Sequence, residues 1–108
     1  MRLLIMPKQK DRHPECGTGW VKLYTPLYAA CEALGVDVTQ VKEKFGGLRF
    51  YTGFRPEWLA DLIHIVEKHS HHVCEKCGES GQTASFGGWY ATLCPQHTRE
   101  RNAANGQA

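Results

Sequence analysis

The sequence predicts an α+β fold: a helix, a β-hairpin and a second helix, followed by a small C-terminal module built on another hairpin. Apolar residues recur at helical spacing in two segments, 19–34 and 56–69, which is typical of helices that pack one face on a core. Two Gly-Gly pairs, at 46–47 and 87–88, each lie between strand-like segments, as expected for two-residue hairpin turns.

Length, charge and hydropathy indicate one small domain. The chain has 108 residues and a formal net charge of +2, so it lacks a strong basic excess. No apolar run approaches the ~20 residues of a membrane span, and the N-terminus lacks the apolar core of a signal peptide. We therefore expect a cytoplasmic protein with one compact domain over residues 1–102 and a disordered tail at 103–108. Residues 1–72 form its helix–hairpin–helix part and residues 73–102 its C-terminal module.

The first helix is expected within residues 19–34, after a mostly irregular N-terminal arm over residues 1–17. Its apolar stripe begins at Trp20, and Gly35 provides a stop signal. Pro26 either kinks this helix or begins a shorter one. The sequence therefore leaves the start of the helix open.

Residues 38–52 have the pattern of a hairpin whose turn is the glycine pair at 46–47. This turn predicts that Lys44 opposes Arg49. Glu43 falls on the otherwise apolar face, which indicates that the register could shift. The apolar face carries Val41, Phe45, Leu48 and Phe50. The opposite face carries Lys42, Lys44, Arg49 and Tyr51.

This basic face has two interpretations. Concentrated cations beside an aromatic side chain would attract an acidic protein surface or a phosphate backbone. Alternatively, the charges form a solvated outer face that discourages strand edges from pairing. Under the first interpretation, the candidate partner-binding residues are Lys42, Lys44, Arg49 and Tyr51.

The second helix, over residues 56–69, is the clearest in the sequence. Pro56 suits the first helical position. The apolar residues that follow at helical spacing are Trp58, Leu59, Leu62, Ile63 and Val66.

Four residues of the C-terminal module have the spacing of zinc ligands. Cys74 and Cys77 form a C-x2-C pair, and after sixteen intervening residues Cys94 and His97 form a second pair. Thiolate sulfur and imidazole nitrogen suit Zn²⁺. Cys94 is placed to cap a short helix that begins at Pro95, which puts His97 on the first turn. Four protein ligands close the coordination shell, which predicts a structural Zn²⁺.

The order of a cysteine knuckle, a hairpin over residues 82–93 and a short helix predicts a treble-clef-like module. Two alternatives remain for the cysteines and histidines. The three cysteines could be incidental buried thiols, or one of His69, His71 and His72 could replace His97 as the fourth ligand.

Two motifs resemble those of a group of small, uncharacterised proteins encoded by phages and prophages. The first is the hairpin sequence KEKFGGLRFY at 42–51. The second is Cys-x2-Cys-Gly at 74–78, followed by Gly-Trp at 88–89 and Thr-Leu-Cys-x2-His at 92–97. The similarity covers about residues 16–97. It implies an accessory role in the cytoplasm of a bacterial host, and it supplies no catalytic residues.

Three functions follow as hypotheses. The first is a zinc-stabilised protein-binding module that binds or inhibits a bacterial host or defence protein. The second is a nucleic-acid-binding zinc protein that uses the basic hairpin. The third is a metal-dependent nuclease, which would need a second metal site from Glu67 and the histidines at 69, 71 and 72. No catalytic constellation is visible in the sequence, and the oligomeric state stays open.

Overall fold

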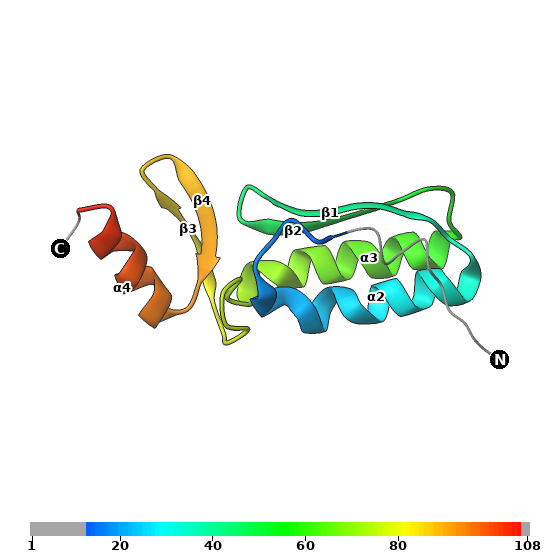
Figure 1. Cartoon of the computed structure of the whole chain (residues 1–108), viewed down its shortest axis with the longest axis horizontal. Coiled ribbons are helices and arrows are strands. Elements are labelled where there is room, and N and C mark those ends of the chain that lie inside the picture. The colour runs from blue at the N-terminus through cyan, green and yellow to red at the C-terminus, as the bar shows by residue number, and fades with distance from the viewer. Residues whose placement is uncertain (1–12, 107–108) are drawn as a thin grey trace.

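The computed structural model describes residues 13–106, which contain three α-helices and two antiparallel hairpins (Figure 1). In chain order the elements are η1 (Thr18–Trp20), α2 (Val21–Leu34), β1 (Val38–Lys44), β2 (Gly47–Thr52), α3 (Glu57–His69), η2 (Ser70–His72), β3 (Gln82–Phe86), β4 (Trp89–Leu93) and α4 (Pro95–Ala104). The predicted mixture of helices and hairpins is therefore confirmed. None of the helices within the described residues has the length and apolar character that a membrane span needs.

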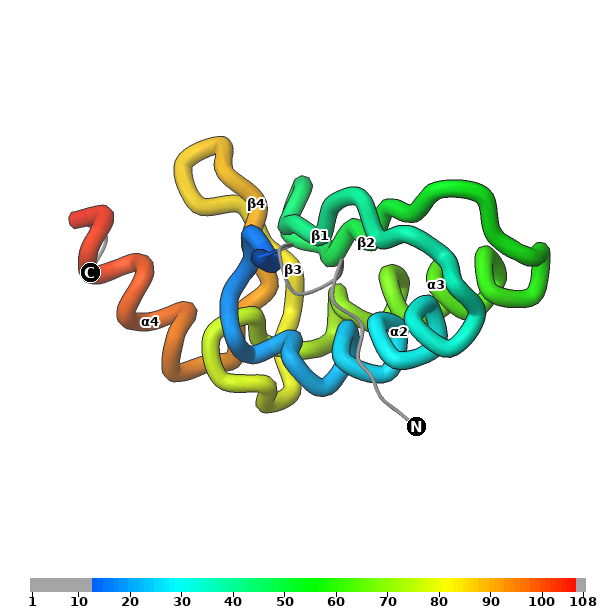
Figure 2. Tube along the Cα trace, turned by 45° about the vertical axis from the view of Figure 1, so that its right-hand side comes forward, coloured from blue at the N-terminus to red at the C-terminus, as the bar shows by residue number. Residues whose placement is uncertain are grey.

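The elements fall into two parts along the molecule. Helices α2 and α3 lie side by side against the β1–β2 hairpin, and the β3–β4 hairpin and α4 form the other end (Figure 1). Figure 2 shows the same division after a rotation. The short η2 turn connects the end of α3 to the second part. We call these the helix–hairpin–helix part and the C-terminal part.

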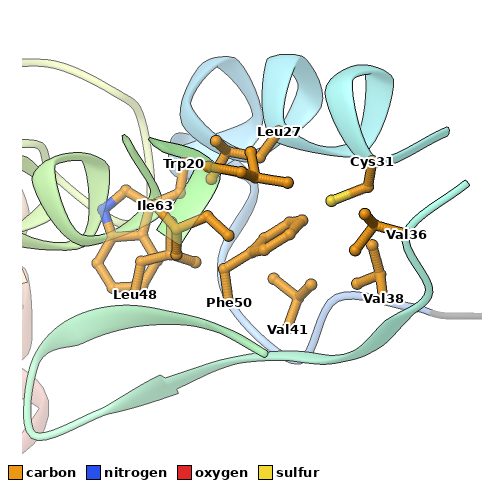
Figure 3. Packing of buried hydrophobic residues seen from close by; sticks show 10 residues of the cluster. Trp20, Leu27, Cys31, Val36, Val38, Val41, Leu48, Phe50 and Ile63 are labelled. Atoms are coloured by element: carbon orange, nitrogen blue, oxygen red, sulfur yellow. The ribbon is translucent and has the colours of Figure 1, made fainter. Parts of the chain in front are cut away.

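The helix–hairpin–helix part contains the main hydrophobic core (Figure 3). Its buried residues are Trp20, Leu27, Cys31, Val36, Val38, Val41, Leu48, Phe50, Leu59 and Ile63. The C-terminal part has a smaller cluster of Cys74, Phe86, Ala91, Leu93 and Cys94. Since two of these five are cysteines, burial of aliphatic and aromatic side chains supplies little stability there. The C-terminal part needs a further source of stability.

Both predicted helices of the first part are confirmed, with small differences at their starts. Helix α2 follows the short η1 turn and ends at Gly35, which adopts a left-handed conformation with φ of 71°. Pro26 lies inside α2, so it does not begin a shorter helix. Pro56 is the N-cap of α3 and therefore lies just before the first helical residue, Glu57.

The turn of the first hairpin is one residue earlier than predicted. Phe45 and Gly46 form the turn, with φ of 55° and 85°. Lys42 pairs with Arg49, so the predicted pairing of Lys44 with Arg49 is wrong. A turn that lies one residue earlier shifts the pairing between the strands by two residues. Since side chains alternate between the two faces of a strand, a shift by an even number leaves them on their predicted faces. Phe45 is the exception, since it leaves the apolar face and is 63% exposed at the turn.

Contacts within the hairpin and with η2 and β4 explain this shifted turn. The carboxylate of Glu43 accepts a hydrogen bond from the Gly46 N–H at 2.8 Å, and the Gly46 carbonyl accepts one from the Thr92 hydroxyl at 2.6 Å. A Cβ added at Gly47 would overlap the His71 ring. The two glycines therefore allow the backbone to approach η2 and β4 closely, in addition to forming the end of the hairpin.

Gly47→Ala should destabilise the protein by about 1–3 kcal/mol, because the new methyl group overlaps the His71 ring. Urea unfolding followed by circular dichroism measures this change. Gly53→Ala is the matched control, since the nearest atom to its Cβ would be 3.9 Å away. Combining Gly47→Ala with His71→Ala should remove the clash and give a favourable coupling energy. Equal effects of Gly47→Ala and Gly53→Ala would contradict this explanation of the glycine pair.

The second hairpin has the predicted turn. Gly87 and Gly88 lie between β3 and β4 with φ of 65° and 93°, and Phe86 pairs with Trp89. Among the described residues, no atom beyond the adjacent ones lies within 4 Å of a Cβ added at either glycine. Here the glycine pair serves the turn alone, which is why local sequence predicted it correctly.

Helix α4 is longer than predicted. It continues to Ala104, two residues into the segment 103–108 that the sequence predicts to be a disordered tail. The Arg101 guanidinium lies over the Phe86 ring, 5.1 Å from its centroid. This cation–π contact attaches the last turn of α4 to β3. Residues 107–108 lie outside the described part of the chain.

Candidate metal centre

The knuckle at residues 74–78 carries the first two candidate ligands. The Cys74 carbonyl accepts a hydrogen bond from the Gly78 N–H at 2.9 Å. Gly78 has φ of 84°, a conformation that L-residues other than glycine rarely adopt. Cys74 is buried and Cys77 is exposed. The tight turn allows both sulfur atoms to face the same point.

The start of α4 carries the other two candidate ligands. Cys94 is the N-cap of α4, and its sulfur accepts a hydrogen bond from the His97 N–H at 3.5 Å. Pro95 occupies the first helical position, as predicted. On the far side of the His97 ring, Nε2 lies 4.0 Å from a Glu100 carboxylate oxygen.

The four candidate ligand atoms lie close enough together to hold one metal ion. All lie within 4.8 Å of one another. The Cys77 and Cys94 sulfurs are 3.8 Å apart, and His97 Nδ1 is 3.2 Å from the Cys94 sulfur and 3.6 Å from the Cys74 sulfur. Zinc bonds of about 2.3 Å to sulfur and 2.0 Å to nitrogen place tetrahedral ligands roughly 3.5–3.8 Å apart. The cluster is therefore compatible with zinc binding.

The surroundings of the cluster favour the thiolate form over the thiol form for two of its cysteines, Cys74 and Cys94. Burial opposes ionisation of Cys74, but N–H groups of Cys94, Cys77 and Lys76 outweigh it and lower the pKa of Cys74 to about 6. The His97 N–H lowers the pKa of Cys94. Hydrogen bonds to the Cys94 and Cys74 sulfurs raise the pKa of His97. Thiolates are the form of cysteine that coordinates a metal, so the backbone N–H groups favour the coordinating form of Cys74 and Cys94.

The N-terminal end of the first helix packs directly on the knuckle. The Gly19 N–H donates to the Glu75 carbonyl at 2.7 Å, and Trp20 Nε1 donates to the Val73 carbonyl at 2.8 Å. The Gly17 N–H donates to the Glu75 carboxylate at 2.8 Å. A Cβ on either glycine would overlap the knuckle. This contact was not predicted from the sequence, although Gly-Thr-Gly-Trp before a helix is a sign of close backbone approach.

His69, His71 and His72, the alternatives to His97 as the fourth ligand, are not part of the metal cluster. His71 Nδ1 lies 2.8 Å from the Thr83 hydroxyl, which contacts the Thr92 hydroxyl at 2.5 Å. Glu67 accepts a hydrogen bond from the Phe50 N–H at 2.8 Å. Within residues 13–106, the one group of three or more side chains that could hold a metal is Cys74, Cys77, Cys94 and His97. The structure therefore assembles no second metal site from Glu67 and these histidines.

The four candidate partner-binding residues share one face of the first hairpin. Lys42 lies directly opposite Arg49, and Tyr51 pairs with Gln40 on the same face. Lys44 and Tyr51 are exposed, whereas Lys42 and Arg49 are half-buried. We call this set of Lys42, Lys44, Arg49 and Tyr51 the basic face.

Comparisons of the chain with protein-family models, curated proteins and solved structures find no significant match in any of the three. The class of protein that the structure defines is an α+β chain with a three-cysteine, one-histidine cluster compatible with zinc binding.

Proposed function

We propose that this chain is a small protein-binding module stabilised by a structural Zn²⁺. The observation that carries the proposal is the cluster of Cys74, Cys77, Cys94 and His97, whose ligand atoms all lie within 4.8 Å of one another. A catalytic zinc keeps an open coordination position for water or substrate, and four protein ligands leave none. The ion would join the knuckle to the start of α4 and so stabilise the part of the chain with the smaller hydrophobic cluster.

In the proposed module, a knuckle supplies two ligands, a hairpin follows, and the first turn of a helix completes the site. The order of the knuckle, β3, β4 and α4 supports this treble-clef-like interpretation. The hairpin brings the two ligand pairs together, and the Glu75 N–H donates to the Thr92 carbonyl at 2.9 Å. A treble clef is a scaffold that serves many functions, so the activity must come from a surface.

The basic face is the proposed partner surface. Val41, Leu48 and Phe50 are buried on the other side of the same hairpin, so the core fixes the direction in which the cations point. One edge of β1 is already covered, because the Glu15 N–H donates to the Val41 carbonyl at 2.7 Å. A partner would therefore contact side chains on the face, and an acidic protein surface has the complementary charge.

The resemblance to small phage and prophage proteins supports a bacterial cytoplasm as the setting. There the proposed partner is a host or defence protein, which this chain binds or inhibits.

Reversing two charges of the basic face tests the partner surface. A tagged wild-type chain should recover a stoichiometric partner from bacterial lysate, and Lys44→Glu/Arg49→Glu should lose it at least tenfold. Lys22→Glu/Arg99→Glu is the matched control, because both residues are exposed and lie on α2 and α4. Equal loss in both double variants, or no partner above background at physiological salt, would contradict the proposal.

Nucleic acid is the second candidate partner, because exposed Tyr51 lies beside cations on the basic face. An aromatic ring among cations suits a single strand, in which bases stack and phosphates pair with the charges. Gel-shift titrations over a range of salt concentrations separate the two candidates. Contacts to phosphate give an affinity that falls steeply with salt. A flat dependence, or no shift, excludes nucleic acid as the partner.

A further inference from the structure

Helix α3 carries large apolar side chains that are exposed and do not pack in the core. Leu59 and Ile63 are buried in the core. On a neighbouring face, Trp58, Leu62 and Ile65 are 55%, 39% and 62% exposed. His69, which is also exposed, continues this row. The four residues are separated by four, three and four positions along the sequence, which is the spacing of a coiled-coil seam. We call Trp58, Leu62, Ile65 and His69 the α3 seam.

Two opposite charges flank the α3 seam on one side. In heptad terms, Leu62 and His69 occupy a positions, Trp58 and Ile65 occupy d positions, and Asp61 and Lys68 occupy g positions. Asp61 and Lys68 are exposed, and neither forms an ion pair within residues 13–106. The corresponding e positions on the other side of the seam hold Leu59 and Val66, which pack on the core.

We propose that two copies of this chain form a two-fold symmetric dimer in which their α3 seams pack in antiparallel orientation. Leu62 then packs against Ile65 of the second copy, and Trp58 packs against His69. Antiparallel helices bring g positions together, so Asp61 faces Lys68 of the second copy and, by symmetry, the same pair forms again.

The charges favour the antiparallel orientation over the parallel one. Parallel helices pair g positions with e positions. In α3 the e positions are apolar and pack on the core of their own chain, so a parallel dimer would leave Asp61 and Lys68 without partners. Because each copy contributes one helix face, the interface is smaller than a standard protein–protein interface. We therefore expect a dimer that forms at high micromolar concentration.

Sedimentation equilibrium of the full zinc-loaded chain tests the dimer. Between about 10 µM and 1 mM, the weight-average mass should rise from one chain toward two. Ile65→Glu should hold the mass at one chain throughout, with an unchanged melting temperature because this side chain is exposed. Trp89→Ser removes an even more exposed side chain from β4 and should dimerise like the wild type. A monomer at 1 mM, or a dimer that persists in Ile65→Glu, would overturn the proposal.

Charge exchange tests the antiparallel orientation. Asp61→Lys and Lys68→Asp should each weaken dimerisation by about threefold or more, because like charges then face each other. The double variant Asp61→Lys/Lys68→Asp should restore the wild-type association. If the double variant is no better than the single variants, the two residues do not face each other and the antiparallel arrangement is wrong.

Discussion

Replacing Cys94 with serine should abolish metal binding and unfold the C-terminal part of the chain. Cys94 belongs to the ligand cluster and also caps α4 through the His97 N–H. Folding free energies on the order of 10 kcal/mol accompany zinc binding in small zinc modules, and this is comparable with the whole stability of a typical domain. Elemental analysis should find one zinc per wild-type chain and nearly none in Cys94→Ser.

Hydrogen exchange should locate the damage in Cys94→Ser. Amide protection should be lost in β3, β4 and α4 and should be retained in α3, because α3 packs on the main core. Cys16→Ser is the matched control. Cys16 is half-buried, and burial together with nearby Glu75 and Glu43 raises the pKa of its thiol to about 11, so it stays protonated. Zinc binding that survives in Cys94→Ser would contradict the assignment of this ligand.

Replacing Trp20 with alanine should give the largest loss of stability outside the metal centre, about 3–5 kcal/mol. Trp20 is fully buried in the main core. Its Nε1 donates to the Val73 carbonyl, next to Cys74. The substitution therefore leaves a cavity in the core and removes a hydrogen bond that connects the core to the knuckle. Urea unfolding followed by circular dichroism measures the loss.

Two further variants separate the contributions of Trp20. Trp20→Phe keeps most of the packing but leaves the Val73 carbonyl without its donor, so we expect a loss of about 1–3 kcal/mol. Trp89→Ala should change stability by less than about 0.5 kcal/mol, because Trp89 is 75% exposed. A Trp20→Ala protein as stable as Trp89→Ala would show that Trp20 does not connect the two parts.

Elements determined by neighbouring residues were predicted well from sequence. Helices α2 and α3 follow from the periodicity of their apolar side chains, and Gly35 ends α2 as predicted. The second hairpin turn also follows from its own residues, because no distant atom within residues 13–106 approaches Gly87 or Gly88. Likewise, the spacing of the cysteines and His97 predicted the cluster of ligand atoms.

Elements determined by distant contacts were predicted poorly. The first hairpin has the same Phe-Gly-Gly sequence as the second, yet its turn is displaced because Gly46 and Gly47 contact His71 and Thr92. The end of α4 depends on Arg101 stacking on Phe86, fifteen positions earlier in the chain. Packing of the η1 turn on the knuckle was missed for the same reason, since no local pattern indicates which segment a glycine approaches.

In the proposed structure, a metal ion joins the knuckle to α4 and thereby stabilises the fold. Thermal unfolding of the purified chain before and after removal of the metal by a strong chelator tests it most directly. The account predicts that the metal-free chain loses cooperative melting or melts at least about 15 °C lower, and that one equivalent of zinc restores the original transition. A metal-free chain that melts cooperatively at the original temperature would contradict it.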